Sequence, residues 1–278
     1  MTNMDSIILQ SNAIRGTLPS FLGALTKLRL LILPNNELTG TIPRGLLTGA
    51  SQLTNLNLAG NNFTGTIPTE ITQLDLTELR LRDNSLVGTV PSGFGSLTQL
   101  RKCPFCSFFA FEKQSLDTRD AATTGRVALD ENGLTGPLPV DLLRNPTAQR
   151  VRLHGNHFTG EIPTNVGQMS SLEDLVLSSN ALRGTLPTEL FRLPDLVQLA
   201  VDTCGMSGTL SEDFARWNRT MRNLILSNNK FTGPIPQAFD HLTTLSELHM
   251  GLVLRGAFRV YDFVANLFQT RCSCTAMP

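Results

Sequence analysis

Apolar side chains recur along this chain at two alternating positions just before an asparagine, and that asparagine returns at a nearly constant interval. The separations between successive asparagines are 24, 25, 23, 48, 24, 24 and 49 residues, and since 48 and 49 are each two periods, two further positions fall at Phe108 and Cys204. The asparagines are Asn12, Asn36, Asn61, Asn84, Asn132, Asn156, Asn180 and Asn229. A period of about 20 to 50 residues predicts a solenoid, in which short units stack and each contacts only its neighbours.

The positions around each asparagine predict the elements of one unit. Leu56 and Leu58 stand five and three residues before Asn61, and this alternation predicts a short strand whose leucines face the core while the residues between them face outward. After the asparagine come an apolar residue, a glycine, and an apolar residue with proline, as in NNFTGTIP at 61–68. Glycine permits backbone angles that other residues avoid, and proline fixes φ and lacks an N–H, so both suit an extended return path.

The asparagine itself predicts how each turn is held. Its amide has two donors and an acceptor, which can satisfy backbone groups where the chain leaves the strand, so stacked units would form a ladder of amides. At Cys204 a buried thiol with a weak S–H donor would take one position of this ladder as a structural, unreactive group.

These positions together resemble the plant-type leucine-rich repeat, LxxLxLxxNxLxGxIPxxLxxL, over roughly residues 4 to 250. The resemblance implies an α/β solenoid, a right-handed superhelix of about eleven 24-residue repeats with a concave parallel β-sheet. We expect this solenoid over 1–250 and a tail over 251–278. Met4, Ile7 and Leu9 already occupy strand positions, and no signal peptide is visible. The cysteine-paired cap usual in secreted members of the family is not found, so we expect a fragment or a truncated gene model.

Residues 102–125 depart from the pattern. The ladder position is Phe108, and the glycine and proline are missing, but the double spacing is kept, so we expect a degenerate repeat rather than an inserted loop. Cys103 and Cys106 form a CxxC that fits free core cysteines, a redox pair or disulfide, or a metal site, although no second pair completes four ligands. The aromatic run fits a local core or an exposed binding patch, and comprises Phe105, Phe108, Phe109 and Phe111.

The tail shows a helical period. Val260, Phe263, Val264 and Leu267 are spaced as one face of a helix, which would cap the last repeat or, alternatively, bind a partner or a membrane surface.

Charge and composition exclude several classes of function. The chain has 23 basic and 23 acidic residues, so it has no general attraction for nucleic acid or an anionic membrane. It has no apolar run of about 18 residues, which predicts no membrane-spanning helix. No phosphate-binding GxxxxGK, kinase signature or metal-ligand set is found, so we expect no cofactor and no metal.

The outward strand positions of the central units carry dense charge, and neighbouring units would bring these side chains together on the concave face. This pattern fits a solvated strand face with internal salt bridges, or an epitope for an anionic or mixed-charge ligand, because arginine makes bidentate contacts with carboxylate and phosphate. The candidate ligand-binding residues are Arg80, Arg82, Lys102, Arg126, Asp130, Arg150, Arg152, His154 and His157.

One set of side chains has the composition of a hydrolase triad. Asp130, His154 and Ser178 hold the same position in three successive units, but an open sheet offers no oxyanion donors and no water-excluding cleft. Zinc at Asp130, His154 and His157 is disfavoured because a turn separates the two histidines. We expect an Asp130–His154 ion pair and no enzymatic activity.

The resemblance implies a non-enzymatic recognition module similar to the ectodomains of plant receptor-like kinases and receptor-like proteins. Such a module would act outside the cell or at its surface and bind a protein or peptide, with a co-receptor as a second partner. The alternatives are a secreted hydrolase inhibitor, similar to polygalacturonase-inhibiting proteins, and an intracellular scaffold. Glycosylation sequons at Asn62 and Asn218 fit the extracellular setting.

Overall fold

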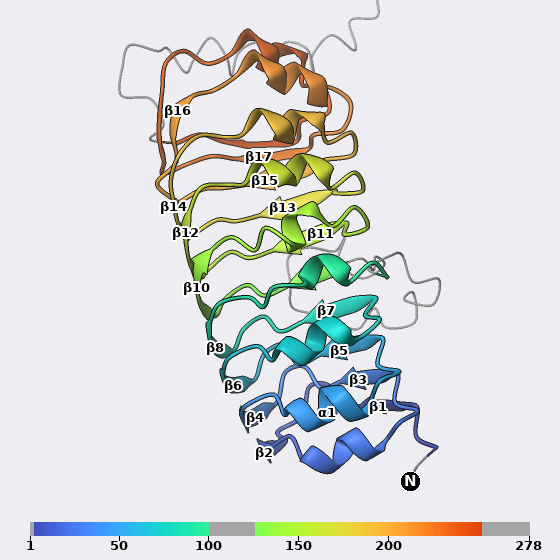
Figure 1. The fold of residues 1–278 in the computed structure, drawn as a ribbon. Helices are drawn as coiled ribbons and strands as arrows, with labels where there is room; N and C mark the ends of the chain where they lie inside the picture. The colour runs from blue at the N-terminus through green and yellow to red at the C-terminus, as the bar shows by residue number, and fades with distance from the viewer. Residues whose placement is uncertain (1–2, 100–125, 252–278) are drawn as a thin grey trace, which may run out of the picture.

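The computed structural model describes residues 3–99 and 126–251, which form one stack of repeats (Figure 1). Each repeat contributes a strand, a turn, in most repeats a second short strand, and a helical turn that leads to the next repeat. All strand pairs are parallel, so the predicted α/β solenoid is confirmed. No helix within the described ranges combines the length and hydropathy needed to cross a membrane.

The largest sheet has ten strands, and we call its outward side the concave face, after the curvature that the family resemblance implies. In order it comprises β1 (Ser6–Ile8), β3 (Leu30–Ile32), β5 (Asn55–Asn57), β7 (Glu78–Arg80), β9 (Arg126–Ala128), β11 (Arg150–Arg152), β13 (Asp174–Val176), β15 (Gln198–Ala200), β17 (Asn223–Ile225) and β19 (Glu247–His249).

Two smaller sheets form a second side of the stack. A seven-stranded sheet contains β2 (Arg15–Thr17), β4 (Glu37–Gly40), β6 (Asn62–Gly65), β8 (Ser85–Gly88), β10 (Gly133–Pro137), β12 (His157–Gly160) and β14 (Ala181–Leu182). It ends at β14, and a separate pair follows, β16 (Ser207–Thr209) and β18 (Lys230–Thr232).

Short helices line the remaining side. They are η1 (Ser20–Ala24), α1 (Arg44–Gly49), η2 (Thr69–Gln73), η3 (Phe94–Ser96), η5 (Leu142–Arg144), η6 (Thr164–Gln168), η7 (Thr188–Arg192), η8 (Glu212–Trp217) and η9 (Gln237–His241). In most repeats a proline immediately precedes the helix in an extended conformation, as Pro68 does before η2. Because proline lacks an N–H and fixes φ, it suits the start of a helix.

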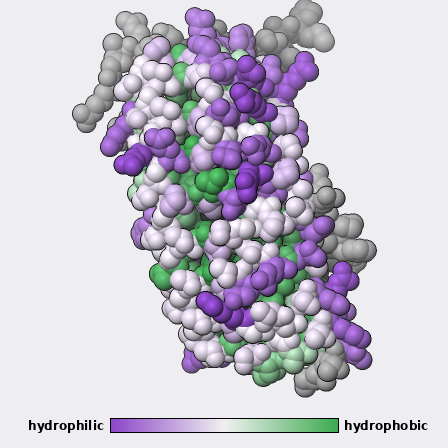
Figure 2. All heavy atoms as spheres, in the orientation of Figure 1, coloured by the Kyte–Doolittle hydropathy of each residue, from purple (hydrophilic) through white to green (hydrophobic). Residues whose placement is uncertain are grey.

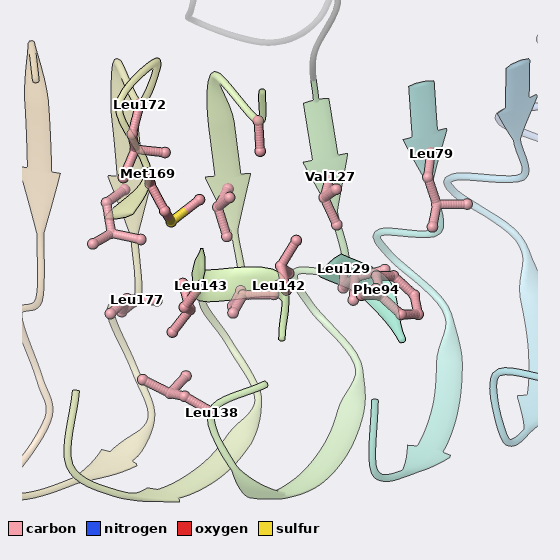
Figure 3. Packing of buried hydrophobic residues seen from close by; sticks show 14 of the residues in the cluster. Leu79, Phe94, Val127, Leu129, Leu138, Leu142, Leu143, Met169, Leu172 and Leu177 are labelled. Carbon is pink, nitrogen blue, oxygen red and sulfur yellow. The ribbon is translucent and has the colours of Figure 1, made fainter. Parts of the chain in front are cut away.

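The core is one continuous apolar column between the sheets and the helices. Leu79 and Val127 point inward from neighbouring strands, with Phe94 and Leu142 packed nearby (Figure 3). Figure 2 shows hydrophobic side chains only in small patches on the viewed surface. Truncating a buried leucine of such a core costs about 2–5 kcal/mol.

The asparagine ladder confirms the chemistry expected of each turn. The Nδ2 of Asn61 donates to the carbonyls of Leu33 and Leu58, each at 3.0 Å, and its Oδ1 accepts the N–H of Leu38 at 3.1 Å. The residue before each ladder position has a positive φ, including Asn35 at 56° and Glu131 at 51°. The amide thus ties its own strand end to the preceding repeat.

Cys204 substitutes for one amide of the ladder, as predicted. Its Sγ donates to the carbonyls of Leu177 and Asp202, both at 3.5 Å, which are the equivalents of the carbonyls that asparagines contact. Burial raises the pKa of the Cys204 thiol, so the reactive thiolate is disfavoured. The seven-stranded sheet ends one repeat earlier, at β14.

The order of strands in the sheet differs from the expectation of a repeat around Phe108. β7 pairs directly with β9, and Asn132 continues the ladder after Asn84, because its Oδ1 accepts the N–H of Leu86 at 3.0 Å. The described sheet has ten strands rather than eleven, with no strand between β7 and β9. An insertion as long as one repeat preserves the spacing, so spacing alone could not distinguish the two arrangements.

Several sequence expectations lie outside the described residues. They concern Lys102, the CxxC of Cys103 and Cys106, the aromatic run around Phe108 and the tail helix at 260–267. The boundary between solenoid and tail stays a prediction.

Candidate functional site on the concave face

The register of the central strands builds two columns of side chains on the concave face. Glu78, Arg126, Arg150 and Asp174 lie side by side in the first column. In the second, Arg80 and Arg152 flank Ala128. We call Arg80, Arg82, Arg126, Arg150 and Arg152 the arginine cluster. Direct pairing of β7 with β9 brings four of its members onto three neighbouring strands, and Arg82 follows two residues after the end of β7.

Acidic side chains are paired with the cluster. The Nε of Arg150 lies 3.2 Å from Asp174 Oδ2, and its Nη2 lies 4.0 Å from Glu173 Oε2. Arg80 forms an ion pair with Glu78 on its own strand. Buried charges are tolerated when they are paired in this way, and breaking one pair leaves an uncompensated charge.

The expectation of a solvated charged face is wrong for three candidate residues. Arg126 is 2% exposed, Arg150 is 7% exposed and Asp130 is 3% exposed. Strands only about 4.8 Å apart place long side chains against one another, so each covers its neighbour's aliphatic stem. Arg82 and His154 keep more exposure, 26% and 29% of their side chains, and His157 is exposed beyond the turn.

His154 lies between two carboxylates, which confirms the expected contact with Asp130. Its Nε2 is 3.6 Å from Asp130 Oδ2 and 3.9 Å from Glu131 Oε1. Burial raises the pKa of the Asp130 carboxyl, and the nearby charges of His154, Arg82 and Arg126 oppose that rise.

Ser178 is not arranged as a nucleophile. Its hydroxyl donates to Asp202 on the next repeat, away from His154. Among residues 3–99 and 126–251, no three His, Cys, Asp or Glu side chains are grouped to hold a metal. Sequence reasoning missed Glu173 and Asp202 as partners; Asp202 could have been found, because it holds the same repeat position as Asp130 and His154.

The two sequon asparagines are both exposed. Asn62 begins β6, and Asn218 follows η8 directly. Each side chain is therefore open to modification, and glycosylation there stays a proposal.

An apolar hollow of about 870 Å³ lies far from the cluster, at the N-terminal end of the stack. It is lined by Leu18, Leu22 and Leu31, which belong to the core cluster. The hollow is thus the end of the core column, and we assign it no ligand.

The repeat pattern matches a known family model in four segments. Residues 52–74, 75–97, 171–193 and 220–242 each match the model described as Leucine Rich Repeat. These four segments are leucine-rich repeats. The plant-type repeats of this chain resemble those of receptor ectodomains.

Two curated relatives from Arabidopsis thaliana support this resemblance. This chain is 40% identical over 73 residues to Protein STRUBBELIG-RECEPTOR FAMILY 1, and 34% identical over 76 residues to a probable LRR receptor-like serine/threonine-protein kinase. The matched segments are 26% and 27% of this chain, and only 9% and 7% of the relatives' own lengths.

Solved structures share the fold over most of this chain. A TDR receptor is 26% identical with a TM-score of 0.73, covering 87% of this chain and 38% of that one. The Arabidopsis receptor kinase HAESA, in complex with the peptide hormone IDA and the co-receptor SERK1, is 25% identical with a TM-score of 0.73, covering 90% and 42%. A Leptospira interrogans LRR protein, 24% identical with a TM-score of 0.67 and covering 91% and 55%, shares the fold.

Proposed function

We propose that this protein is a non-enzymatic, receptor-like recognition module whose arginine cluster binds an anionic group of a peptide or protein. The observation that carries the proposal is the direct pairing of Arg126 with Arg150 on β9 and β11. Like charges placed opposite one another destabilise a sheet, and in this column the neighbouring Glu78 and Asp174 offset part of that cost. Arg80, Arg82 and Arg152 add positive charge around it, and guanidinium groups suit bidentate contacts with carboxylates.

The relatives support a receptor role over the alternatives. HAESA binds a peptide hormone and a co-receptor in its solved complex, and the matched curated relatives are receptor-like proteins. We therefore propose a peptide ligand, a co-receptor as second partner and an extracellular or cell-surface location. These relatives favour neither a hydrolase inhibitor nor an intracellular scaffold.

A test on the cluster must avoid residues that hold the fold. Arg150 is buried against Asp174, so its removal would confuse stability with binding. Arg82 and Arg152 are less buried, so the test variant is Arg82→Ala with Arg152→Ala. The matched control, Arg15→Ala with Arg44→Ala, removes two arginines that lie off the concave face and are at least 74% exposed.

The probe is a random peptide library displayed on phage and selected on the parent protein. We expect enriched peptides to be acidic, to bind the test variant at least tenfold more weakly and to bind the control like the parent. Their affinity should fall with salt, because the Debye length drops from about 30 Å at 0.01 M to about 3 Å at 1 M. Enriched peptides that lack acidic residues, or that bind the test variant equally well, would overturn the proposal.

A further inference from the structure

Asn132 differs from the other ladder asparagines in the residue that follows it. That residue is Gly133, and the two form the only Asn–Gly pair in the sequence. The side-chain carbonyl carbon of an asparagine can be attacked by the backbone nitrogen of the next residue, and a β-carbon on that residue hinders the approach. Glycine has no β-carbon, so Asn132 carries the most labile amide of the ladder.

The glycine at this position is explained by packing. A β-carbon on Gly133 would lie 3.2 Å from Cγ1 of Val87 and 3.3 Å from the carbonyl oxygen of Leu86. Gly133 is paired directly with Val87 where β10 meets β8, so the sheet leaves little room for a larger residue. The sheet therefore favours glycine here, and the labile pair follows from that choice.

The Asn132 amide joins the repeats of β7 and β9. Its Nδ2 donates to the carbonyls of Leu81, Leu129 and Asp130 at 3.1, 3.2 and 3.0 Å. Its Oδ1 accepts the N–H of Leu86 at 3.0 Å. A carboxylate can only accept hydrogen bonds, so in the place of this amide it would face three carbonyl oxygens without a proton to share. Loss of the amide would therefore weaken the joint between the two repeats.

The same contacts protect the amide, so a reaction at Asn132 proceeds when this joint opens locally. Two features favour opening. Asn132 is half-buried, whereas the ladder residues Asn61 and Asn156 are buried. In addition, the neighbours Glu78 and Arg126 are 48 residues apart, two periods of the chain, and closing a longer connection costs more entropy.

We propose that Asn132 is a site of spontaneous deamidation, which converts one amide of the ladder to a carboxylate. The backbone nitrogen of Gly133 bonds to Cγ of Asn132 and gives up its proton, the Cγ–Nδ2 bond breaks, and Nδ2 leaves with that proton as ammonia. Water then adds to the cyclic imide at Cγ to give aspartate, or at the main-chain carbonyl carbon to give isoaspartate, which lengthens the main chain by one carbon. The net reaction consumes one water molecule and releases one ammonia.

The test incubates the full chain at neutral pH while it stays folded, and peptide mass spectrometry measures deamidation at each ladder asparagine. We expect deamidation at Asn132 to be at least about tenfold faster than at Asn84 and Asn229, which are also half-buried but precede serine and lysine. Enzymatic methylation detects the isoaspartate. Gly133→Ala with Val87→Ala makes room for the added β-carbon, and it should slow the reaction at Asn132 by about tenfold or more. Thermal unfolding checks that this variant is folded.

A second variant, Asn132→Asp, measures what the product does to the stack. We expect a lower melting temperature than the parent and faster amide exchange in β8 and β10. The matched control Asn62→Asp, at an exposed position, should change neither. Deamidation at Asn132 no faster than at Asn84, or an undiminished rate in the folded Gly133→Ala variant, would overturn the proposed site. An unchanged melting temperature for Asn132→Asp would overturn its effect on the joint.

Discussion

Glu78 and Arg126 lie directly beside each other on β7 and β9, although 48 residues separate them in the chain. The ladder passes from Asn84 to Asn132 in the same way. The repeats of β7 and β9 are therefore direct neighbours in the described part of the stack.

Deletion of residues 102–125 should leave a folded solenoid. The joined sequence, LTQLRRVAL, then matches LTKLRLLIL at 25–33, with Leu100 in the place of Leu28. We expect the melting temperature to stay within about 4 °C of the parent, equivalent to about 1 kcal/mol or less. Extending the deletion to 127 removes the buried Val127 and should lower stability sharply. Unfolding of the shorter deletion would show that the segment supplies a structural unit.

Asn61→Ala should cost about 3 kcal/mol of unfolding free energy. It removes the partner of the Leu38 N–H and of buried carbonyls, and each buried group left unsatisfied costs about 1–3 kcal/mol. The neighbouring Asn62 is exposed, so Asn62→Ala should change stability by less than about 0.5 kcal/mol. Urea denaturation of both variants measures the difference. Equal stabilities would mean that backbone groups find other partners.

Gly49→Ala should destabilise the first two repeats. A β-carbon on Gly49 would lie 2.2 Å from the carbonyl oxygen of Gly23, so α1 and η1 would have to separate. Gly45 belongs to the same helix but has nothing within 4 Å of a β-carbon, so Gly45→Ala should stabilise the helix by up to about 1 kcal/mol. The melting temperatures of Gly49→Ala and Gly45→Ala should shift in opposite directions. Shifts in the same direction would contradict the close contact between Gly49 and the Gly23 carbonyl.

Asp130→Asn should make the protein more stable than the parent at pH 7. Burial raises the pKa of Asp130 above its value of about 3.9 in the unfolded chain, so the folded state holds the proton more tightly. Stability from this group is lost as pH rises from about 3.9 through the folded pKa, and the loss is complete above it. The advantage of the variant should therefore shrink as pH falls toward 4.

Urea denaturation across this pH range measures the effect of Asp130→Asn. The control is Asp83→Asn, because Asp83 is exposed on the preceding repeat. A variant less stable than the parent at pH 7 would show that the contacts of Asp130 with His154 and the arginines outweigh its burial.

The repeat could be predicted from sequence because its determinants are local. Leu56, Leu58 and Asn61 act within one unit, and the position of Cys204 follows from the same count. The spacing of the ladder asparagines led to the prediction of a repeat at Phe108, because an extra segment one period long leaves that spacing unchanged. The burial of Arg126 and Arg150 was also missed, since it depends on which strands become neighbours. For the same reason the pairing of Ser178 with Asp202 could not be read from either repeat alone.

The end of the seven-stranded sheet at β14 has a consequence for the geometry of the concave face. The ten-stranded sheet is continuous past this point, whereas strand pairing on the second side begins again at β16. Between these strands the second side is held by the backbone hydrogen bond from the N–H of Ser207 to the carbonyl of Gly184, at 2.7 Å, rather than by a paired strand, so the stack bends more easily about the ten-stranded side. Arg152 lies before the division and Ile225 lies after it. A small change of angle there would alter the distance between Arg152 and Ile225, and with it the curvature of the ten-stranded sheet.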